Sequence, residues 1–284
     1  MTTTRSTAPV PLPTAKEREL KAWLVARRTV LVGYSGGVDS AFLACVAREE
    51  LGRDGVLAVV GRSAAYPEQQ WEHARSVARQ FDIPLLEVPT DELQDARYAA
   101  NPTNRCYHCK TVLWQTLVPI AAARGLAVII DGTNADDLAD YRPGHRAAQE
   151  RGVRSPLAEL GFSKADIRAL SQRHGIPGWA NPSSPCLASR LPYGFAVTAE
   201  RLAQVERAEA ALRALGISGN LRVRHHGDLA RVELDATELR EWLLPEPRRT
   251  LRHALLASGF ERVALDLRGF RSGSLNVLSG VAGS

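Results

Sequence analysis

The sequence predicts an α/β protein: a parallel sheet with helices on both faces, followed by a smaller C-terminal α+β domain. Over the first 130 residues, short apolar strands alternate with helix-length segments, which is typical of βαβ units. From about residue 198 the pattern changes to one long helix and two adjacent strands. With 284 residues, 45% of them hydrophobic, the chain is long enough to bury a core in each part.

Local signals place the elements of the first part. Thr14 and Glu17 form a capping box that opens the first helix. Apolar runs predict strands over 29–34, 56–60, 85–88 and 127–130. We expect the intervening helices to run from the end of the first strand to about Leu51, over 67–81, and onward from Cys109.

The second part has a different order of elements. We expect a helix over 198–215, strands over 221–226 and 229–234, helices near Glu238 and over 248–258, and a strand over 262–267. The chain is therefore divided into a disordered lead (1–13), a first domain (14–190), a second domain (191–270) and a flexible tail (271–284).

Composition excludes several classes of protein. No apolar stretch approaches the roughly 20 residues that cross a bilayer, and the N-terminus lacks the hydrophobic region of a signal peptide. We therefore expect a cytoplasmic protein with no membrane partner, whose four cysteines do not form a disulfide scaffold. Residues 1–141 carry a net charge of −2 and residues 142–284 one of +7. The second half thus suits an anionic partner such as a nucleotide, a polycarboxylate or RNA.

A glycine-rich hexapeptide follows the first strand: Ser35, Gly36, Gly37, Val38, Asp39 and Ser40. The glycines let the backbone turn tightly and approach a ligand, and the helix that begins here directs its free amides at an anion. The two serines add hydroxyl donors. The loop is neither a Walker A motif nor a Rossmann fingerprint. An ordinary glycine-rich turn is the alternative, and we favour a phosphate site.

Three of the four cysteines lie in segments predicted as loops or helix starts. Cys106 and Cys109 form a C-x-x-C pair after the loop at 101–104, and Cys186 lies in a second loop with two prolines. Such a pair is a redox dithiol, part of a metal site, or two thiols that only pack in the core. Three thiolates suit a [4Fe–4S] cluster with one iron left open, and zinc completed by a histidine is a less favoured alternative. Cys45 lies among apolar residues and is assigned to the core.

Other polar residues are candidates for ligand contacts. Asn134 and Asp137 follow the fourth strand, at the edge where parallel sheets bind ligands; they face a nucleotide or cap a turn. Arg190, Arg222 and Arg224 are candidates for binding carboxylates and phosphate, because a guanidinium grips either group in bidentate fashion. Most arginines in so arginine-rich a chain are simply solvated.

The hexapeptide SGGVDS resembles the pyrophosphate loop of the PP-loop ATP pyrophosphatases. Together with DGTNADDL, PCLASR, RVR and DLRGFRSGS, in that order along nearly the whole chain, it resembles the LarE-type sulfur transferases. The resemblance implies that residues 35–40 hold the pyrophosphate of ATP, with Asp39 helping to place Mg²⁺. It also implies that Glu233 is a carboxylate of the substrate or metal site, the alternative being an ordinary strand residue that faces water. The C-terminal domain of the family takes part in assembling a homo-oligomer, which we expect here too.

The resemblance also implies a reaction. A carboxylate of pyridinium-3,5-biscarboxylate mononucleotide attacks the α-phosphate of ATP, and a sulfur nucleophile then displaces AMP to give a thiocarboxylate for a nickel cofactor. In one branch of the family the sulfur comes from a single sacrificed cysteine that matches Cys186. This chain also carries Cys106 and Cys109, so it resembles the other branch, in which three cysteines hold a [4Fe–4S] cluster bearing an exchangeable sulfide. Sacrifice of Cys186 stays an alternative.

Rival functions share the loop. A tRNA thiolase suits the basic second half, but the lysine of the SGGKDS form and an added RNA-binding module are both missing from this sequence. An ammonia-dependent amidating synthetase needs no thiols, and a nucleotide sensor binds ATP without releasing pyrophosphate. We therefore expect a small-molecule nucleotide substrate and a sulfide donor as partners, and no nucleic acid.

Overall fold

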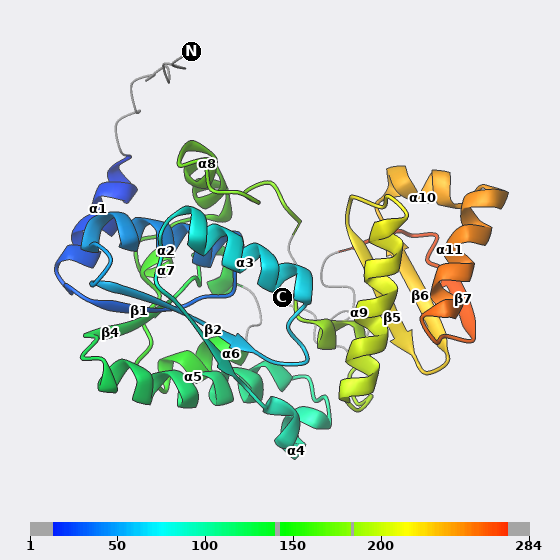
Figure 1. Cartoon of the computed structure of the whole chain (residues 1–284), viewed down its shortest axis with the longest axis horizontal. Helices are drawn as coiled ribbons and strands as arrows, with labels where there is room; N and C mark the ends of the chain where they lie inside the picture. Colours follow the sequence, from blue (N-terminus) through cyan, green and yellow to red (C-terminus); the bar gives the residue numbers. More distant parts are fainter. Residues whose placement is uncertain (1–13, 140–142, 183–184, 272–284) are drawn as a thin grey trace, which may run out of the picture.

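A computed structural model describes residues 14–139, 143–182 and 185–271. The predicted lead and all but the first residue of the predicted tail lie outside these ranges. Within them the chain forms two sheets, each with its own helices (Figure 1). The strands of the first sheet are β1 (Val30–Gly33), β2 (Val56–Arg62), β3 (Leu85–Pro89) and β4 (Val128–Asp131). Their order is β3-β2-β1-β4 and every pairing is parallel, as the sequence predicts.

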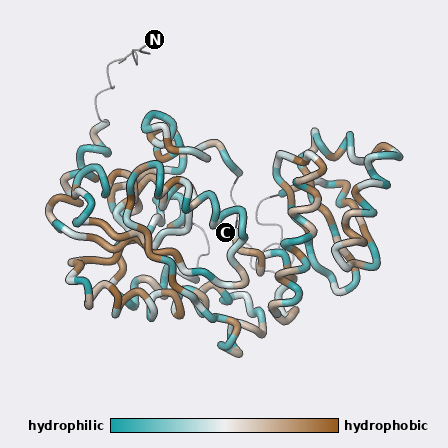
Figure 2. The backbone as a smooth tube through the Cα atoms, in the orientation of Figure 1, coloured by the Kyte–Doolittle hydropathy of each residue, from teal (hydrophilic) through white to brown (hydrophobic). Residues whose placement is uncertain are grey.

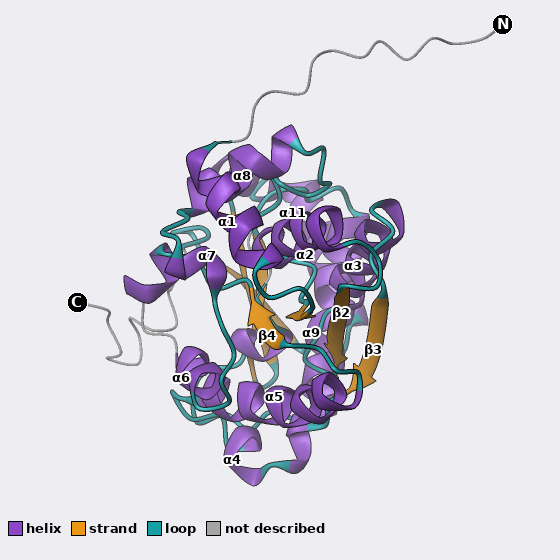
Figure 3. Ribbon diagram, turned by 90° about the vertical axis from the view of Figure 1, so that its left-hand side faces the viewer, coloured by secondary structure: helices purple, strands orange, loops and turns teal. Residues whose placement is uncertain are grey.

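Helices cover both faces of this sheet, because alternate residues of each strand point in opposite directions. Val30 and Val32 face a core shared with helices α1, α2, α3 and α8, whereas Leu31 faces a core shared with α5 and α6. Figure 3 shows the two groups on opposite sides of the strands, and Figure 2 shows the strands between them as the most hydrophobic part of the backbone. These helices are α1 (Ala15–Val25), α2 (Val38–Leu51), α3 (Glu68–Gln80), α5 (Arg105–Ala123), α6 (Pro143–Gln149) and α8 (Lys164–Arg173).

Short elements lie between the strands and helices of the first sheet and lead from it to the second. They are η1 (Glu92–Gln94), α4 (Ala96–Ala99), η2 (Asp136–Ala139), α7 (Pro156–Glu159) and η3 (Leu187–Arg190). Around α4 and η3 a separate apolar cluster forms, and the first half of α9 (Ala199–Ala214) packs into it through Leu202 and Val205. This cluster joins the two parts of the chain.

The second sheet has the order β5-β6-β7, with β5 and β6 antiparallel and β6 and β7 parallel. Its strands pack against the second half of α9 and against two further helices, through residues such as Leu212, Trp242 and Leu255. These elements are β5 (Leu221–His226), β6 (Leu229–Leu234), α10 (Ala236–Trp242), α11 (Pro245–Ala257) and β7 (Arg262–Leu265). The fold class predicted from the sequence is therefore confirmed.

One element begins earlier than the sequence predicts. Helix α5 starts at Arg105, with Asn104 as its N-cap, so Cys106 and Cys109 lie in its first turns and not in the loop before it. Pro102 ends the preceding segment, and nothing after it prevents a helix. This start places Cys106 and Cys109 on one face of α5, because positions three apart lie side by side on a helix. It therefore favours one site shared by the two thiols.

Candidate active site

The glycine-rich loop connects β1 to α2, as expected. Gly36 adopts φ +67°, and a Cβ there would lie 2.6 Å from Cβ of Ala74, so only glycine fits between the loop and α3. Gly37 caps α2 without a side-chain hydrogen bond, which leaves the first amides of that helix without side-chain capping. Ser40 Oγ accepts from the Ser35 amide at 3.2 Å and donates to the Gly37 carbonyl at 3.0 Å. The loop, which we call the cradle, thus has the geometry expected of an anion site at the positive end of a helix dipole.

The segment after β4 holds the cradle from the other side. A Cβ on Gly132 would lie 2.7 Å from the amide nitrogen of Ser40, so the two backbones are in direct contact. Asn134 and Asp137 bond to each other: the Asn134 amide donates to Asp137 Oδ2 at 3.2 Å, and the Asp137 amide donates to Asn134 Oδ1 at 3.1 Å. They therefore cap the turn. Asn134 Nδ2 is buried, and no described residue accepts a hydrogen bond from it.

A lysine outside the predicted site also reaches the loop. Lys164, the first residue of α8, places its Nζ 2.8 Å from Asp39 Oδ2, and its amide donates to Asp136 Oδ2 at 2.8 Å. The capping box of Ser163 and Asp166 fixes this helix start. That S-x-x-D signal is visible in the sequence, but its proximity to the loop 125 residues earlier is not.

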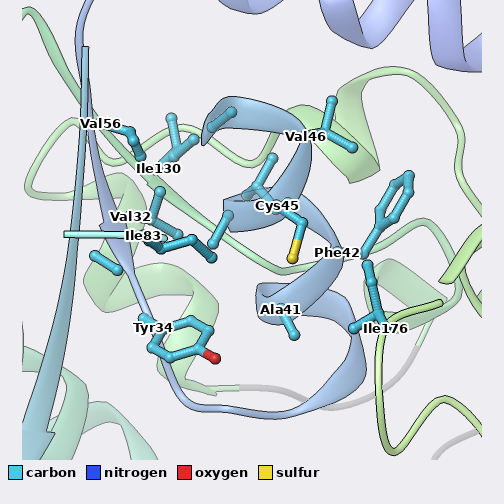
Figure 4. Close-up of a cluster of buried hydrophobic side chains, with 14 of the residues drawn as sticks. Val32, Tyr34, Ala41, Phe42, Cys45, Val46, Val56, Ile83, Ile130 and Ile176 are labelled. Atoms are coloured by element: carbon cyan, nitrogen blue, oxygen red, sulfur yellow. The ribbon is translucent and has the colours of Figure 1, made fainter. Parts of the chain in front are cut away.

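The three cysteines assigned to one site converge. The thiol of Cys186 interacts electrostatically with those of Cys106 and Cys109, and the latter two interact with each other. Arg105 connects the two segments: its guanidinium donates to the carbonyl of Ala188, two residues after Cys186, at 3.0 Å. Cys45 lies elsewhere, in the core between α2 and the sheet (Figure 4), where burial raises the pKa of its thiol to about 12.

The thiols differ in exposure: Cys106 is exposed, and Cys109 and Cys186 are partly buried. Burial, together with the Glu92 carboxylate and Cys186, raises the pKa of the Cys109 thiol well above its ordinary value, and Cys109 Sγ lies 4.0 Å from Glu92 Oε1. Among the described residues, no three His, Cys, Asp or Glu side chains form a group that suits a single metal ion. Thiolates that bind different irons of a cubane cluster lie further apart than the ligands of one ion, and three cysteines match such a cluster in donor type and number.

The basic candidates form a buried network beside the Cys186 turn. Arg190, 2% exposed, donates to both carboxylate oxygens of Glu209 at 2.8 Å and to the carbonyl of Pro185 at 2.7 Å. Arg224 donates to the Ser189 carbonyl at 2.8 Å and to Glu233 at 2.9 Å. The first of these bonds ties the second sheet to the turn that carries Cys186.

Arg222, the third arginine, lies in the same network. Its guanidinium donates to the Leu221 carbonyl at 2.6 Å. Burial, with Arg190 nearby, lowers its pKa to about 10. The carboxylate of Glu209, which binds Arg190, offsets part of this repulsion.

These features define the class of protein. A parallel sheet whose first strand feeds an SGGVDS cradle, with the following loops and a lysine converging on it, is the site of an ATP-using enzyme of the PP-loop class. A model of the NAD synthase family matches residues 22–106, the part that contains the cradle. No described helix is long and apolar enough to cross a membrane.

Comparison with individual proteins identifies the family. The chain is 46% identical over 246 residues to the uncharacterized protein slr1717 of Synechocystis sp., covering 87% of this chain and 91% of that protein. It is 38% identical over 261 residues to the pyridinium-3,5-bisthiocarboxylic acid mononucleotide synthase of Lactiplantibacillus plantarum, covering 92% and 94%. Protein MJ0830 of Methanocaldococcus jannaschii is 27% identical over 245 residues. The chain therefore belongs to the LarE family, as its motifs predict.

Proposed function

We propose that this enzyme adenylates the carboxylates of pyridinium-3,5-biscarboxylic acid mononucleotide with ATP and converts them to thiocarboxylates for a nickel-pincer cofactor. The name of the Lactiplantibacillus plantarum relative supports the substrate. The observation that carries the proposal is a pair of hydrogen bonds that connects the glycine-rich loop with the turn after Cys186. Tyr66 Oη donates to the Ser35 carbonyl at 2.9 Å, and the carbonyl of its neighbour Ala65 accepts from the Leu187 amide at 2.9 Å. Adjacent residues thus contact the phosphate cradle and the turn after Cys186.

The first step, adenylation of the substrate, takes place at the cradle. A substrate carboxylate oxygen bonds to the α-phosphorus of ATP, the bond from that phosphorus to the bridging oxygen breaks, and pyrophosphate leaves. The α2 amides, the hydroxyls of Ser35 and Ser40, and Lys164 Nζ offset the charge of the leaving pyrophosphate. We assign Asp39 to Mg²⁺, since carboxylate oxygens are its preferred protein ligands. The buried Asn134 amide donor gains its partner from the nucleotide.

The second step, sulfur transfer, takes place at the three cysteines. We assign Cys106, Cys109 and Cys186 to hold a [4Fe–4S] cluster, which would supply an exchangeable sulfide. Sulfide would bond to the acyl carbon as the bond from that carbon to the AMP oxygen breaks and AMP leaves. Arg105 holds the Cys186 turn against α5 and so keeps the third thiol in place.

The buried network positions the substrate. We assign Arg222, Arg224 and Glu233 to the substrate's anionic groups and their surroundings, because they extend from the Cys186 turn into the second sheet. Arg190 bonds the carbonyls around Cys186 directly, and we assign it to hold that turn as well as to favour the anionic substrate. We further propose a cytoplasmic homo-oligomer with domains over 14–190 and 191–270.

Pyrophosphate release tests the substrate assignment. With ATP and Mg²⁺, the pyridinium biscarboxylate mononucleotide should stimulate release from the full chain, and bulk tRNA should not. Asp39→Ala and Ser40→Ala should each abolish the stimulated release while the fold, followed by circular dichroism, persists. Release driven by tRNA alone would replace the proposal with a tRNA thiolase. Release driven by deamido-NAD with ammonia would replace it with an amidating synthetase.

Iron content and intact mass test the sulfur source. Replacing Cys106, Cys109 or Cys186 by Ser should lower both iron content and multiple turnover relative to the wild type, each protein being reconstituted without oxygen. The reason is that two thiolates hold a cubane poorly. Cys45→Ser is the matched control and should leave iron content unchanged. If Cys186 is instead sacrificed, the intact mass falls by about 34 Da after one turnover, the mass of the H₂S lost from a thiol. That result would reject the cluster and keep the family.

A further inference from the structure

Tyr98 lies at the centre of the cluster that joins the two parts of the chain. It belongs to the short helix α4 and is 1% exposed. Leu187 and Ala188, from the turn after Cys186, share its apolar cluster, and Cys109 and Cys186 pack against the same cluster. The ring therefore fills the space between α5 and the Cys186 turn, beside the sulfur atoms.

The hydroxyl of Tyr98 is buried, and no described residue forms a hydrogen bond with it. Its nearest charged and ionisable neighbours are the thiols of Cys186 and Cys109, the Glu92 carboxylate and the Arg105 guanidinium, each of which interacts with it electrostatically. Burying a hydroxyl without a partner is unfavourable, and the few such groups in native proteins usually mark a function or a bound species. A phenylalanine would fill the same volume without this cost.

The surroundings hold Tyr98 firmly. Asp95 caps α4 by accepting from the Arg97 amide at 2.9 Å, and the Ala99 carbonyl accepts from the Val197 amide at 2.8 Å. Asn101, at the end of α4, donates to the Pro192 carbonyl at 2.8 Å. The Asp95 cap fixes the start of α4, and the two bonds after Tyr98 fix its end to the chain that follows Cys186. The hydroxyl cannot turn to solvent without breaking these bonds.

We propose that the Tyr98 hydroxyl is part of a sulfide-binding subsite: it donates a hydrogen bond to the sulfur atom that the three-cysteine site carries to the substrate. This inference rests on the proposed function. Inorganic sulfide fits because the side chains packed around Tyr98 are thiol and apolar, and because Arg105, 4% exposed, is a buried positive charge among them. Arg105 interacts with Cys106, Cys186 and Tyr98, so its positive charge acts on the thiols and on the hydroxyl alike.

Tyr98→Phe tests the subsite in the full chain reconstituted with iron without oxygen. Titration with sodium sulfide, followed by visible absorbance, should give a sulfide Kd at least about tenfold higher than in the wild type, as for loss of one hydrogen bond to a charged acceptor. The KM for sulfide in thiocarboxylate formation should rise in parallel. Iron content should match the wild type, since no ligand of the cluster is changed.

The metal-free protein provides a second readout. Because the Tyr98 hydroxyl has no partner within the described chain, Tyr98→Phe should leave the Tm unchanged or raise it. Tyr34→Phe is the matched control: this hydroxyl is also buried but donates to the Ala74 carbonyl at 3.1 Å, so its loss should lower the Tm. An equal sulfide Kd in Tyr98→Phe and wild type, or a Tm loss like that of Tyr34→Phe, overturns the subsite. Wild-type protein that takes up no iron or sulfide overturns the cluster assignment itself.

Discussion

Gly132→Ala tests whether contact between two backbones sets the shape of the phosphate cradle. The new Cβ would lie 2.7 Å from the Ser40 amide nitrogen and 3.0 Å from Ser40 Cα. Ordinary contact begins at 3.4 Å, so the β4 loop and the start of α2 must separate by about 0.7 Å. Overpacking of this kind costs about 1–3 kcal/mol of stability. A shift approaching 1 Å in a reacting group lowers the rate by about 10- to 100-fold.

Two measurements separate these effects. Substrate-dependent pyrophosphate release should fall by about 10- to 100-fold in Gly132→Ala, and the Tm should fall by about 5 °C. The control is Gly152→Ala, where φ is +69° and no atom lies within 4 Å of the new Cβ. It should lose about 1–2 kcal/mol through backbone strain alone, with pyrophosphate release intact. Wild-type release in Gly132→Ala would refute the idea that this contact sets the cradle.

Three further predictions concern charges. Lys164→Met should lower kcat/KM for ATP about tenfold, with partial recovery in Lys164→Arg, because the cation that offsets the leaving charge is lost; steady-state kinetics check this. Glu17→Gln should cost about 3–5 kcal/mol in urea unfolding, since Glu17, 1% exposed, is paired with Arg173 and His174. The side-chain hydrogen bond from Arg97 lowers the pKa of Asp95 to about 2. Its stabilisation is therefore complete above pH 4 and lost as the pH falls towards 2, a loss that unfolding of Asp95→Asn should not show.

The sequence predicts the strands well because their signals are local. β5 and β6 occupy the predicted residues 221–226 and 229–234, since the alternation of apolar residues and the His226-Gly227-Asp228 turn are contained within a few positions. The predicted start of α5 is wrong because the helix begins only three residues after Pro102, and the capping residue there, Asn104, makes no side-chain bond that a motif would reveal.

The residues that sequence reasoning missed act across long separations. Lys164 meets Asp39 across 125 residues and Arg105 meets Ala188 across 83, and no spacing rule links such positions. The partners of a buried arginine are equally hidden: the charge of Arg190 makes it a candidate, but its bonds to Glu209 and to the carbonyls around Cys186 depend on how α9 packs. Tyr98 carries no motif, and only the missing partner of its hydroxyl distinguishes it.

The hydrogen bonds that join α4 and α5 to the chain after Cys186 also determine when, during translation, the three cysteines come together. Cys106 and Cys109 leave the ribosome 77 residues or more before Cys186, which corresponds to about 4–15 s of translation at typical rates. Until the chain has passed Val197, the carbonyl that Arg105 bonds and the amide that bonds Ala99 have not both been made. The proposed metal centre on these three thiols therefore forms only late in translation or after it. A nascent chain stalled before residue 186 presents Cys106 and Cys109 without the third ligand.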